Sequence, residues 1–329
     1  MAQHDMVIRA GSVIDGTGRE AFTADVAIKD GLIVEVGKVS GAGQREINAD
    51  GALVTPGFVD IHTHYDGQAT WSNRMSPSSH HGVTTVVMGN CGVGFAPVRP
   101  TDHNLLIELM EGVEDIPGVA LSEGLSWEWE SFPDYLDYLS KRQFDMDIGA
   151  QLPHAALRVY VMGQRGADRE PATAEDVLEM RRLTEEAIRA GALGFTSSRT
   201  LNHRSVRGEP TPTLQAEYDE LVGMASALHS SGRGVMEMIS DFDDLDEEFS
   251  LLESMVRSAG RPMSISLAQG ISDHFTHLEC CAGRRIYFVL MMSLNNLNVI
   301  TLIEHLGCDL EKLKCGINTH THIWRKHNC

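Results

Sequence analysis

The stretch VDIHTHYDGQ places His62 and His64 two residues apart, directly after an apolar run. On a β-strand, residues i and i+2 project to the same side, so the two imidazoles would point together. Two imidazoles at this separation can bind one divalent metal ion while their second ring nitrogens are held by outer partners. Since two polar residues on one face of a strand are also common without a metal, the pair by itself indicates a metal site only weakly.

Short apolar strands alternate with amphipathic helices around this motif. One helix is predicted to begin after Thr173, with Asp176 as its capping-box partner, and to end at Gly191. Two more are predicted over about 215–231 and after the acidic run Asp241–Glu248. This alternation indicates a parallel sheet, and closing it into a barrel would bring the carboxyl ends of the strands, where active sites form, to one face. The predicted strands are 57–64, 84–89, 147–152, 192–197, 234–239 and 262–267.

Three other parts of the chain differ from this pattern. Residues 1–55 are predicted to form short strands, with KDG at Lys29–Gly31 as a hairpin turn. Residues 92–143 form a long connection rich in Trp, Pro and acidic residues, which we interpret as a lid that crosses the site, with a decoration that has no role there as the alternative. Residues 273–329 contain no recognisable strand–helix unit and hold every cysteine except Cys91, so this tail differs in character from residues 56–272.

The composition limits the classes of partner. The formal net charge of −19 argues against a nucleic-acid or anionic-membrane partner, because Lys and Arg supply that attraction. Asparagines interrupt the longest apolar-leaning run, Ile286–Leu306, so a membrane span is not expected. No apolar stretch follows a basic amino terminus, which argues against a secretory signal. We therefore expect a cytoplasmic protein.

Three motifs together resemble the amidohydrolase superfamily, in particular its D-aminoacylase, or N-acyl-D-amino-acid deacylase, branch. They are PGFVDIHTH after the β-rich segment, GNCGVGFAPV at Gly89–Val98, and GALGFTSSRTLNHRSVRGEPTPT at Gly191–Thr213. The resemblance covers roughly residues 5–272. It implies an α/β fold in which 1–55 belong to a composite β-domain and 56–272 supply the first six or so units of a metal-dependent (β/α)8, TIM-like barrel that is incomplete in this chain. It also implies hydrolysis of a non-peptide C–N amide bond in a small N-acyl-D-amino acid.

The same resemblance implies a set of metal ligands. Cys91 occupies the place of a metal-binding cysteine after the second strand, and a bound metal would stabilise its thiolate. Glu237 aligns where the family has a histidine on strand five; a carboxylate can bind zinc, and the alternative is a salt bridge near the core. Strand six offers no histidine. The implied cofactor is Zn²⁺ on His62, His64, Cys91 and Glu237, with one ion favoured over two.

Four residues are candidates for substrate binding. His154, at the end of the third predicted strand, would line the pocket or serve as a structural histidine. Arg199, His203 and Arg204 follow the fourth strand at the same face. The carboxylate of an acyl amino acid suits the fork of an arginine guanidinium, whereas a structural basic loop is the alternative.

The proton acceptor of the reaction has no candidate in the sequence. In this superfamily an aspartate at the end of strand eight takes the proton from the attacking water, and nothing after Asp273 resembles that strand. An inactive, truncated chain that self-associates through exposed sheet edges is therefore one alternative. A cyclic amidase of the dihydropyrimidinase kind is another, although LGFTSSRT lacks the lysine that commonly bridges two metals there.

The tail suggests two further features. Cys308, Cys315, His320 and His322 could be combined into a zinc site, but their spacing fits none of the standard forms. The apolar string IYFVLMM is predicted to lack a partner strand and would then favour aggregation.

Overall fold

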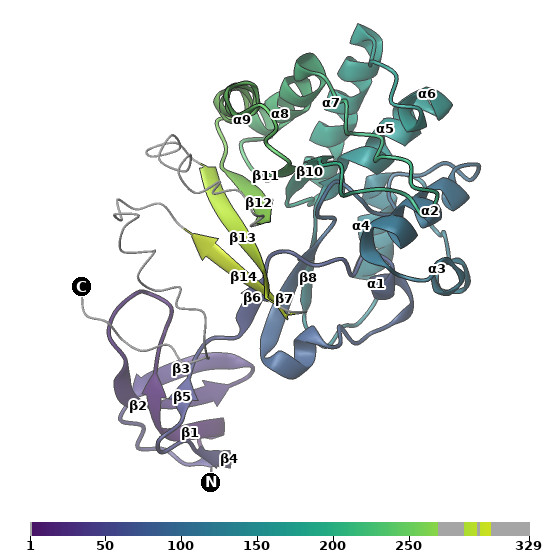
Figure 1. Ribbon diagram of the computed structural model, residues 1–329. Helices are drawn as coiled ribbons and strands as arrows, with labels where there is room; N and C mark the ends of the chain where they lie inside the picture. The colour runs from purple at the N-terminus through teal and green to yellow at the C-terminus, as the bar shows by residue number, and fades with distance from the viewer. Residues whose placement is uncertain (1, 269–285, 295–296, 304–329) are drawn as a thin grey trace. The chain divides into compact units, whose positions relative to one another are not determined.

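The computed structural model describes residues 2–268, 286–294 and 297–303 (Figure 1). The chain divides into two compact units. One comprises Met1–Val59 with His80–Thr85, and the other comprises Asp60–Ser79 with the residues from Val86 onward. Among the described residues, no helix combines the length and the apolar character needed to cross a membrane.

The first unit is built on a five-stranded sheet, as predicted for residues 1–55. Its strand order is β3-β2-β1-β4, and β5 also pairs with β1. The predicted Lys29–Gly31 turn joins β2 and β3, where Asp30 and Gly31 have φ values of 52° and 75°, the left-handed backbone that a tight hairpin requires. The strands are β1 (His4–Val13), β2 (Phe22–Lys29), β3 (Leu32–Gly37), β4 (Gly43–Asn48) and β5 (Leu53–Val54).

The remaining strands form two sheets. One has the order β6-β7-β8, and the other has the order β14-β13-β12-β11-β10-β9, in which the neighbours from β9 to β13 are parallel. The predicted strand–helix alternation is confirmed, and the described strands pair as these two sheets. The strands are β6 (Phe58–Asp60), β7 (Val83–Met88), β8 (Asp147–Ala150), β9 (Leu152–Pro153), β10 (Gly194–Arg199), β11 (Val235–Ser240), β12 (Met263–Ala268), β13 (Ile286–Leu294) and β14 (Leu297–Ile303).

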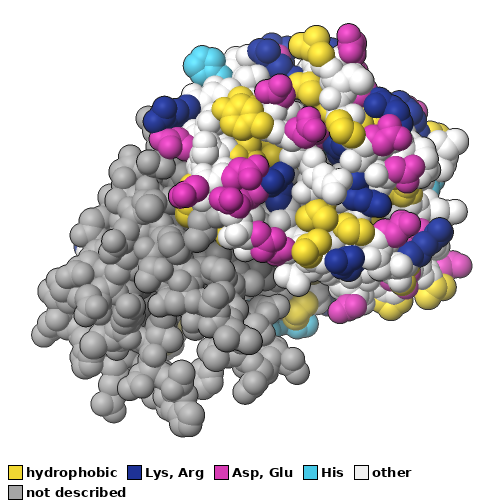
Figure 2. Space-filling model, turned by 45° about the horizontal axis from the view of Figure 1, so that its top comes forward, with side chains coloured by type: hydrophobic (Ala, Val, Ile, Leu, Met, Phe, Trp, Pro, Cys, Tyr) yellow, Lys and Arg dark blue, Asp and Glu magenta, His cyan; other side chains and the backbone are white. Residues whose placement is uncertain are grey.

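Three helices of the second unit lie side by side next to the larger sheet (Figure 1): α7 (Ala174–Ala190), α8 (Tyr218–Ser231) and α9 (Leu245–Ala259). The predicted capping box is present at α7, where Thr173 accepts from the Asp176 backbone N–H and Asp176 accepts from that of Thr173, and Gly191 ends the helix at a φ of 122°. Acidic and basic side chains are interspersed on the described part of the face in Figure 2, as expected for solvated helices.

The long connection at 92–143 contains three helices: α2 (His103–Glu114), α3 (Gly118–Gly124) and α4 (Phe132–Ser140). Tyr135 and Tyr138 of α4 donate hydroxyl protons to the carbonyl oxygens of Asp66 and Thr70 over 2.8 and 2.9 Å. These bonds attach the connection to the segment that directly follows His64. The remaining helices are α1 (Gln68–Trp71), α5 (His154–Met162) and α6 (Gln164–Ala167).

One prediction for the tail is wrong. The string IYFVLMM lies in β13, which has partner strands on both sides: it pairs parallel with β12 and antiparallel with β14. Sequence alone could not reveal this pairing, because β12 precedes β13 by a connection of 17 residues (269–285). The residues of the suggested tail zinc site, Cys308, Cys315, His320 and His322, lie outside the described residues.

Candidate metal centre

His62 and His64 follow β6 in a short segment that is neither helix nor strand. The strand ends at Asp60, earlier than the predicted 57–64, so ladder pairing does not hold the histidines directly. Instead, Thr63 between them donates its backbone N–H and its hydroxyl to the carbonyl oxygen of Val87 on β7, over 3.0 and 2.8 Å. The two imidazole rings lie on the same side, 5.3 Å apart at an angle of 68°. The predicted juxtaposition is therefore present, although the threonine, and not a strand, produces it.

Cys91 lies in a tight turn that follows β7. Its own φ is 55°, and glycines flank the turn at Gly89 and Gly92 with φ values of 82° and 70°. A Cβ on Gly92 would come within 3.0 Å of the Ser197 backbone, and one on Gly89 would overlap a carbonyl oxygen, so both positions need glycine. The turn places the Cys91 Sγ 3.2 Å from the His62 Nε2. One donor atom from each of His62, His64 and Cys91 lies within 4.8 Å of the others.

Thr196 of β10 holds this turn in place through two hydrogen bonds. Its hydroxyl accepts from the Gly92 N–H over 2.9 Å and donates to the Gly89 carbonyl oxygen. The side chain is fully buried. The bonds connect the second and fourth predicted strands at their carboxyl ends, and they fix where the Cys91 thiol points.

Replacing Thr196 with valine should therefore weaken both the fold and the metal site. The isosteric change leaves the buried Gly92 N–H without an acceptor, which costs about 1–3 kcal/mol of unfolding free energy. Denaturant unfolding and metal titration would measure the two effects. Thr184→Val is the matched control, because Thr184 is equally buried but donates only to a carbonyl oxygen within its own helix, and a comparable loss there would contradict the explanation.

Glu237 and Ser266 lie beside the histidines and the cysteine. Glu237, on β11, is 2% exposed; its Oε2 accepts from the Cys91 backbone N–H over 3.0 Å and its Oε1 accepts from the Ser266 hydroxyl over 2.8 Å. The Ser266 Oγ is also 3.1 Å from the His62 Nδ1. Glu237 thus belongs to the cluster, but both of its oxygens have hydrogen-bond partners, and it is not one of the three residues whose donor atoms converge. The sequence analysis did not identify Ser266.

Glu114 and Asp66 are two further acidic residues at the site that the sequence analysis missed. The Glu114 Oε1, at the end of α2, is 3.3 Å from the His64 Nε2. Asp66 is 3% exposed and stands two residues after His64, so the HTHYD motif itself could have indicated it. Glu114 carried no such signal, since it comes from the connection at 92–143 and reaches the site only through the packing of α2.

Gly112 allows that packing. Helix α2 lies against residues 204–206, and a Cβ on Gly112 would overlap the Arg204 carbonyl oxygen and the Val206 nitrogen, which are backbone atoms that cannot rotate away. Glycine at this point lets the two backbones touch. The close approach brings Glu114, two residues further along, to His64.

Gly112→Ala should consequently destabilise the chain by about 1–3 kcal/mol, as overpacking does, although alanine is the better helix former. Denaturant unfolding would show whether the free energy of unfolding falls or rises. Gly223→Ala in α8 is the control, because its Cβ would meet only the Cγ1 end of the Val177 side chain, at 2.7 Å. If Gly112→Ala were neutral or stabilising, the close approach of α2 would not be required.

Burial dominates the electrostatics of the site. It lowers the pKa of His62 to about 4, with nearby His203 as a smaller cause, and lowers the pKa of His64 well below its usual range. It raises the pKa of the Cys91 thiol well above its usual range, and the carboxyl of Glu237 adds to that effect. Both histidines are therefore neutral near pH 7, which is the form that binds a metal ion.

Burial also shifts the pKa values of the carboxyl groups at the site. Burial raises the pKa values of Asp66 and Glu237 to about 7. It raises the pKa of Glu114 to about 8, and the nearby carboxyl of Asp66 adds to that increase. Within the described part of the chain, the buried Asp66 Oδ2 and His64 Nδ1 have no hydrogen-bond partner. Unpaired buried acceptors beside a thiol and neutral imidazoles are the surroundings that a divalent cation would satisfy, and the donors are those that zinc prefers.

His154 occupies a buried network at the start of α5. Its Nδ1 is 2.8 Å from the Ser197 Oγ and its Nε2 is 2.8 Å from the Glu220 Oε1, and the side chain has no exposed surface. Arg158 donates to both oxygens of Glu220 over 2.8 and 2.7 Å and also to the Glu170 carbonyl oxygen. Both ring nitrogens of His154 are engaged within the protein, as in the structural alternative considered for this residue.

The three residues predicted to bind substrate at and after the end of β10 differ in their surroundings. Arg199 binds Glu248 at 2.7 Å and donates to the Ala216 carbonyl oxygen over 2.6 Å, so its guanidinium is already paired. His203 is half-buried with its Nδ1 2.8 Å from the Ser198 Oγ, and its charge would lower the pKa of both site histidines. Arg204 donates to the Gly208 carbonyl oxygen over 3.0 Å in an exposed turn. His203 is thus the one of the three that lies beside the cluster.

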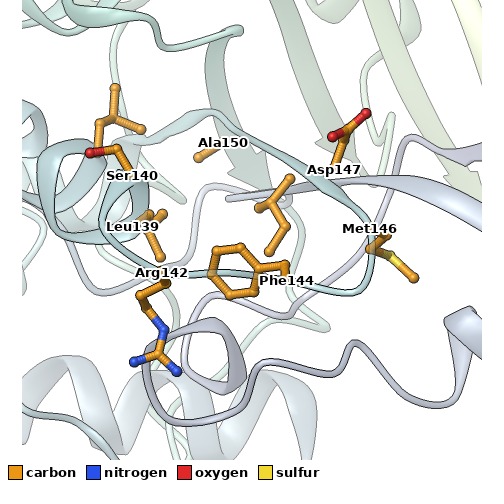
Figure 3. Close-up of a pocket in the computed structure, with 9 residues that line it drawn as sticks. Leu139, Ser140, Arg142, Phe144, Met146, Asp147 and Ala150 are labelled. Carbon is orange, nitrogen blue, oxygen red and sulfur yellow. The ribbon is translucent and has the colours of Figure 1, made fainter. Parts of the chain in front are cut away.

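A separate cavity of about 380 Å³ lies between α4 and β8 (Figure 3). Its lining combines apolar side chains with the polar ones of Ser140, Arg142 and Asp147. The guanidinium of Arg142 lies 5.8 Å from the ring of Phe144 in its wall. One of its lining residues, Asp147, is the first residue of β8, whereas the histidines and Cys91 lie beyond the carboxyl ends of β6 and β7. The lining residues are Leu136, Leu139, Ser140, Arg142, Phe144, Met146, Asp147, Ile148 and Ala150. The cavity shares no residue with the metal-ligand cluster.

Known proteins resemble this chain in sequence and in structure. Residues 45–287 match the amidohydrolase family. The D-aminoacylase of Alcaligenes xylosoxydans xylosoxydans is 30% identical over 229 residues, which are 69% of this chain and 43% of that protein. An N-acyl-D-aspartate deacylase of the same organism is 32% identical over 231 residues, 70% of this chain and 43% of that protein. A solved D-aminoacylase mutant in complex with copper chloride has a TM-score of 0.70 at 26% identity, covering 88% of this chain and 58% of that one.

The matched region holds the whole cluster described above, from His62 through Cys91 and Glu237 to Ser266. The chain spans about 43% of the length of the two curated relatives. With most of its length matched, and with its relatives in sequence and structure both D-aminoacylases, the chain belongs to the amidohydrolase family, on the D-aminoacylase branch.

Proposed function

We propose that this chain is part of a metal-dependent hydrolase that cleaves non-peptide C–N amide bonds, specifically an N-acyl-D-amino-acid deacylase. The observation that carries the proposal is the convergence of His62, His64 and Cys91 within 4.8 Å, at the ends of strands as in a barrel-type active site. The strand–helix units would form the first part of a (β/α)8 barrel. The relatives named as D-aminoacylase and N-acyl-D-aspartate deacylase supply the substrate class.

One zinc ion would be held by His62, His64 and Cys91. Three protein ligands leave a coordination position open, which is the arrangement of catalytic zinc sites. The bound ion would polarise the acyl carbonyl and lower the pKa of a water molecule. Since both oxygens of Glu237 accept hydrogen bonds from Cys91 and Ser266, we do not count that residue as a fourth ligand.

The residues of the chain itself would bind and orient the substrate. His203, beside the two site histidines, and Arg204, in the following turn, are the proposed contacts to the substrate carboxylate. The low exposure of His62, Cys91 and Glu237 would keep bulk water away from the reacting carbonyl. No described residue is assigned to the transfer of the proton to the leaving amine.

The test is hydrolysis of N-acetyl-D-amino acids by the purified, zinc-loaded chain, measured as the release of the free amine. The L-enantiomers and a cyclic amide such as dihydrouracil serve as comparison substrates. We expect release from the D-series alone. A chain that binds zinc but hydrolyses none of them would favour the inactive alternative, whereas hydrolysis of the cyclic amide would favour a cyclic amidase.

A further inference from the structure

We infer that Asp241 is a positioning residue for substrate binding, because it fixes the backbone that leads from β10 to His203. The inference rests on the proposed function, in which His203 contacts the substrate carboxylate, and it names a residue outside the metal-ligand cluster that sets where this contact lies. Thr200 directly follows β10, and Asp241 directly follows the neighbouring strand β11. The parallel ladder between these strands ends with Arg199 opposite Ser240, so strand pairing holds neither Thr200 nor Asp241.

The Asp241 carboxylate accepts two hydrogen bonds from the segment after β10. Its Oδ2 accepts the Leu201 backbone N–H over 2.7 Å, and its Oδ1 accepts the Thr200 hydroxyl proton. The Thr200 Oγ1 in turn accepts the Asn202 N–H over 3.1 Å, so the carboxylate acts on three consecutive residues. Hydrogen bonds to a charged acceptor are roughly twice as strong as neutral ones. We call this set of bonds the Asp241 clamp.

His203 lies two residues beyond Leu201, at the base of a hairpin. Its carbonyl oxygen accepts the Thr211 N–H over 3.1 Å. Its Nδ1 is 2.8 Å from the Ser198 Oγ, and within the described part of the chain its Nε2 has no hydrogen-bond partner. The Nε2 is thus the ring nitrogen that remains for a substrate oxygen, on a residue that lies beside both site histidines.

The tip of the hairpin is anchored separately from its base. The Val206 N–H donates to the Glu108 carbonyl oxygen of α2 over 2.9 Å, and this bond does not involve Asp241. Loss of the clamp should therefore loosen residues 200–203 and leave the tip on α2. The position of His203, which lies between the two anchors, would then be less well defined.

The acidic run that contains Asp241 provides a matched control. The start of α9 does not depend on Asp241, since Asp244 is the N-cap and accepts the Glu247 N–H over 3.0 Å. Asp243 is exposed, and no hydrogen bond joins its side chain to another described residue. Asp243→Ala therefore removes the same side chain two positions away without touching the clamp.

Amide hydrogen exchange of the metal-free chain tests the clamp first. In Asp241→Ala the amides of residues 200–203 should exchange about tenfold faster, because the Leu201 N–H loses its acceptor, while those of α7 should not change. Asp241→Asn should keep most of the protection, since its amide oxygen still accepts from Leu201 and its NH₂ group can donate to the Thr200 Oγ1. Asp243→Ala should match the unmodified chain. Unchanged exchange in Asp241→Ala would overturn the inference, whatever the activity of the chain.

Binding of an acid and of its carboxamide then tests the link to the substrate. Affinities for N-acetyl-D-alanine and N-acetyl-D-alanine amide are measured by titration of the metal-free chain, in which no turnover occurs. We expect Asp241→Ala to weaken binding of the acid about 10–100-fold and to leave binding of the carboxamide unchanged, because only the acid offers His203 a charged acceptor. Asp241→Asn should restore most of the affinity. Adding His203→Ala to Asp241→Ala should cause little further loss, since both act through one contact.

The outcomes separate this inference from the proposed function. An equal loss for the acid and the carboxamide would indicate a merely structural role and overturn the inference. Binding of the acid that Asp241→Ala leaves unchanged would also overturn it, and would leave the proposed function intact. If the unmodified chain bound neither compound while residues 200–203 exchanged as expected, the proposed function would fail and the substrate role of Asp241 with it, whereas the clamp itself would stand.

Discussion

Replacing His62 and His64 together by alanine should abolish stoichiometric zinc binding. Two of the three donors that lie within 4.8 Å of one another would be lost, and Cys91 alone cannot hold the ion. The expected fall in affinity exceeds the roughly 100-fold effect of losing an outer partner. Elemental analysis of the purified chain after dialysis against a weak chelator would give about one zinc per chain before the change and a negligible amount after it.

A matched pair of histidines provides the control for that experiment. His80 and His81 are adjacent, exposed and located in a short 3-10 helix, so their replacement by alanine changes the same number of imidazoles away from the cluster. Zinc content should stay unchanged in this variant. Unchanged zinc in the His62 and His64 double variant would place the metal elsewhere and remove the basis of the proposed function.

The Arg158→Met variant is expected to lose about 3–5 kcal/mol of unfolding free energy, the usual effect of breaking a buried ion pair. Arg158 has no exposed surface and makes two hydrogen bonds to Glu220, which also lies against His154. Removal of the guanidinium leaves the Glu220 carboxylate buried without a countercharge, in the interior between α5 and α8. Denaturant unfolding monitored by circular dichroism would measure the loss.

Two further variants make the Arg158 prediction specific. Arg182→Met removes an arginine that pairs with Glu179 and Glu186 on the surface of α7, where its side chain is 57% exposed, and should cost no more than about 1 kcal/mol. Adding Glu220→Leu to Arg158→Met removes the uncompensated charge and should recover part of the stability. Equal losses at Arg158 and Arg182 would mean that the buried network contributes no more than a surface pair.

Three residues outside the histidine motif lie against the proposed ligands. Glu114 contacts His64, Ser266 contacts His62, and Glu237 accepts a hydrogen bond from the Cys91 backbone N–H. Substitutions at these outer positions are therefore expected to affect metal binding even though none of the three side chains is counted as a ligand.

Local signals in the sequence were sufficient for several features. The capping box at Thr173 and Asp176 and the terminal Gly191 define α7 because all their partners lie within one helical turn. The Asp30–Gly31 hairpin needs only its own backbone conformation. The pairing of His62 with His64 is likewise local, since the two are separated by a single threonine.

Other features required contacts between distant segments. Glu114 reaches His64 because Gly112 lets α2 touch residues 204–206, and no pattern within 92–143 encodes that approach. Ser266 reaches His62 across 204 positions in the chain, and β13 gains its two partner strands from segments on either side. Glu237, predicted as a metal ligand, lies beside the cluster, and its hydrogen bonds to Cys91 and Ser266 could not be read from the sequence.

By itself the sequence determined the β-rich first unit, the strand–helix alternation, the histidine pair and, through resemblance, Cys91, because each depends on neighbours a few residues away or on a recognisable motif. Tertiary structure alone decided how the turn at Cys91 is held by Thr196, which carboxyl groups lie against His64 and Cys91, and that His154 is enclosed with Glu220 and Arg158. The physical reason is that a hydrogen bond or an ion pair in a buried site depends on the distance between two atoms, and for residues far apart in the chain only packing sets that distance.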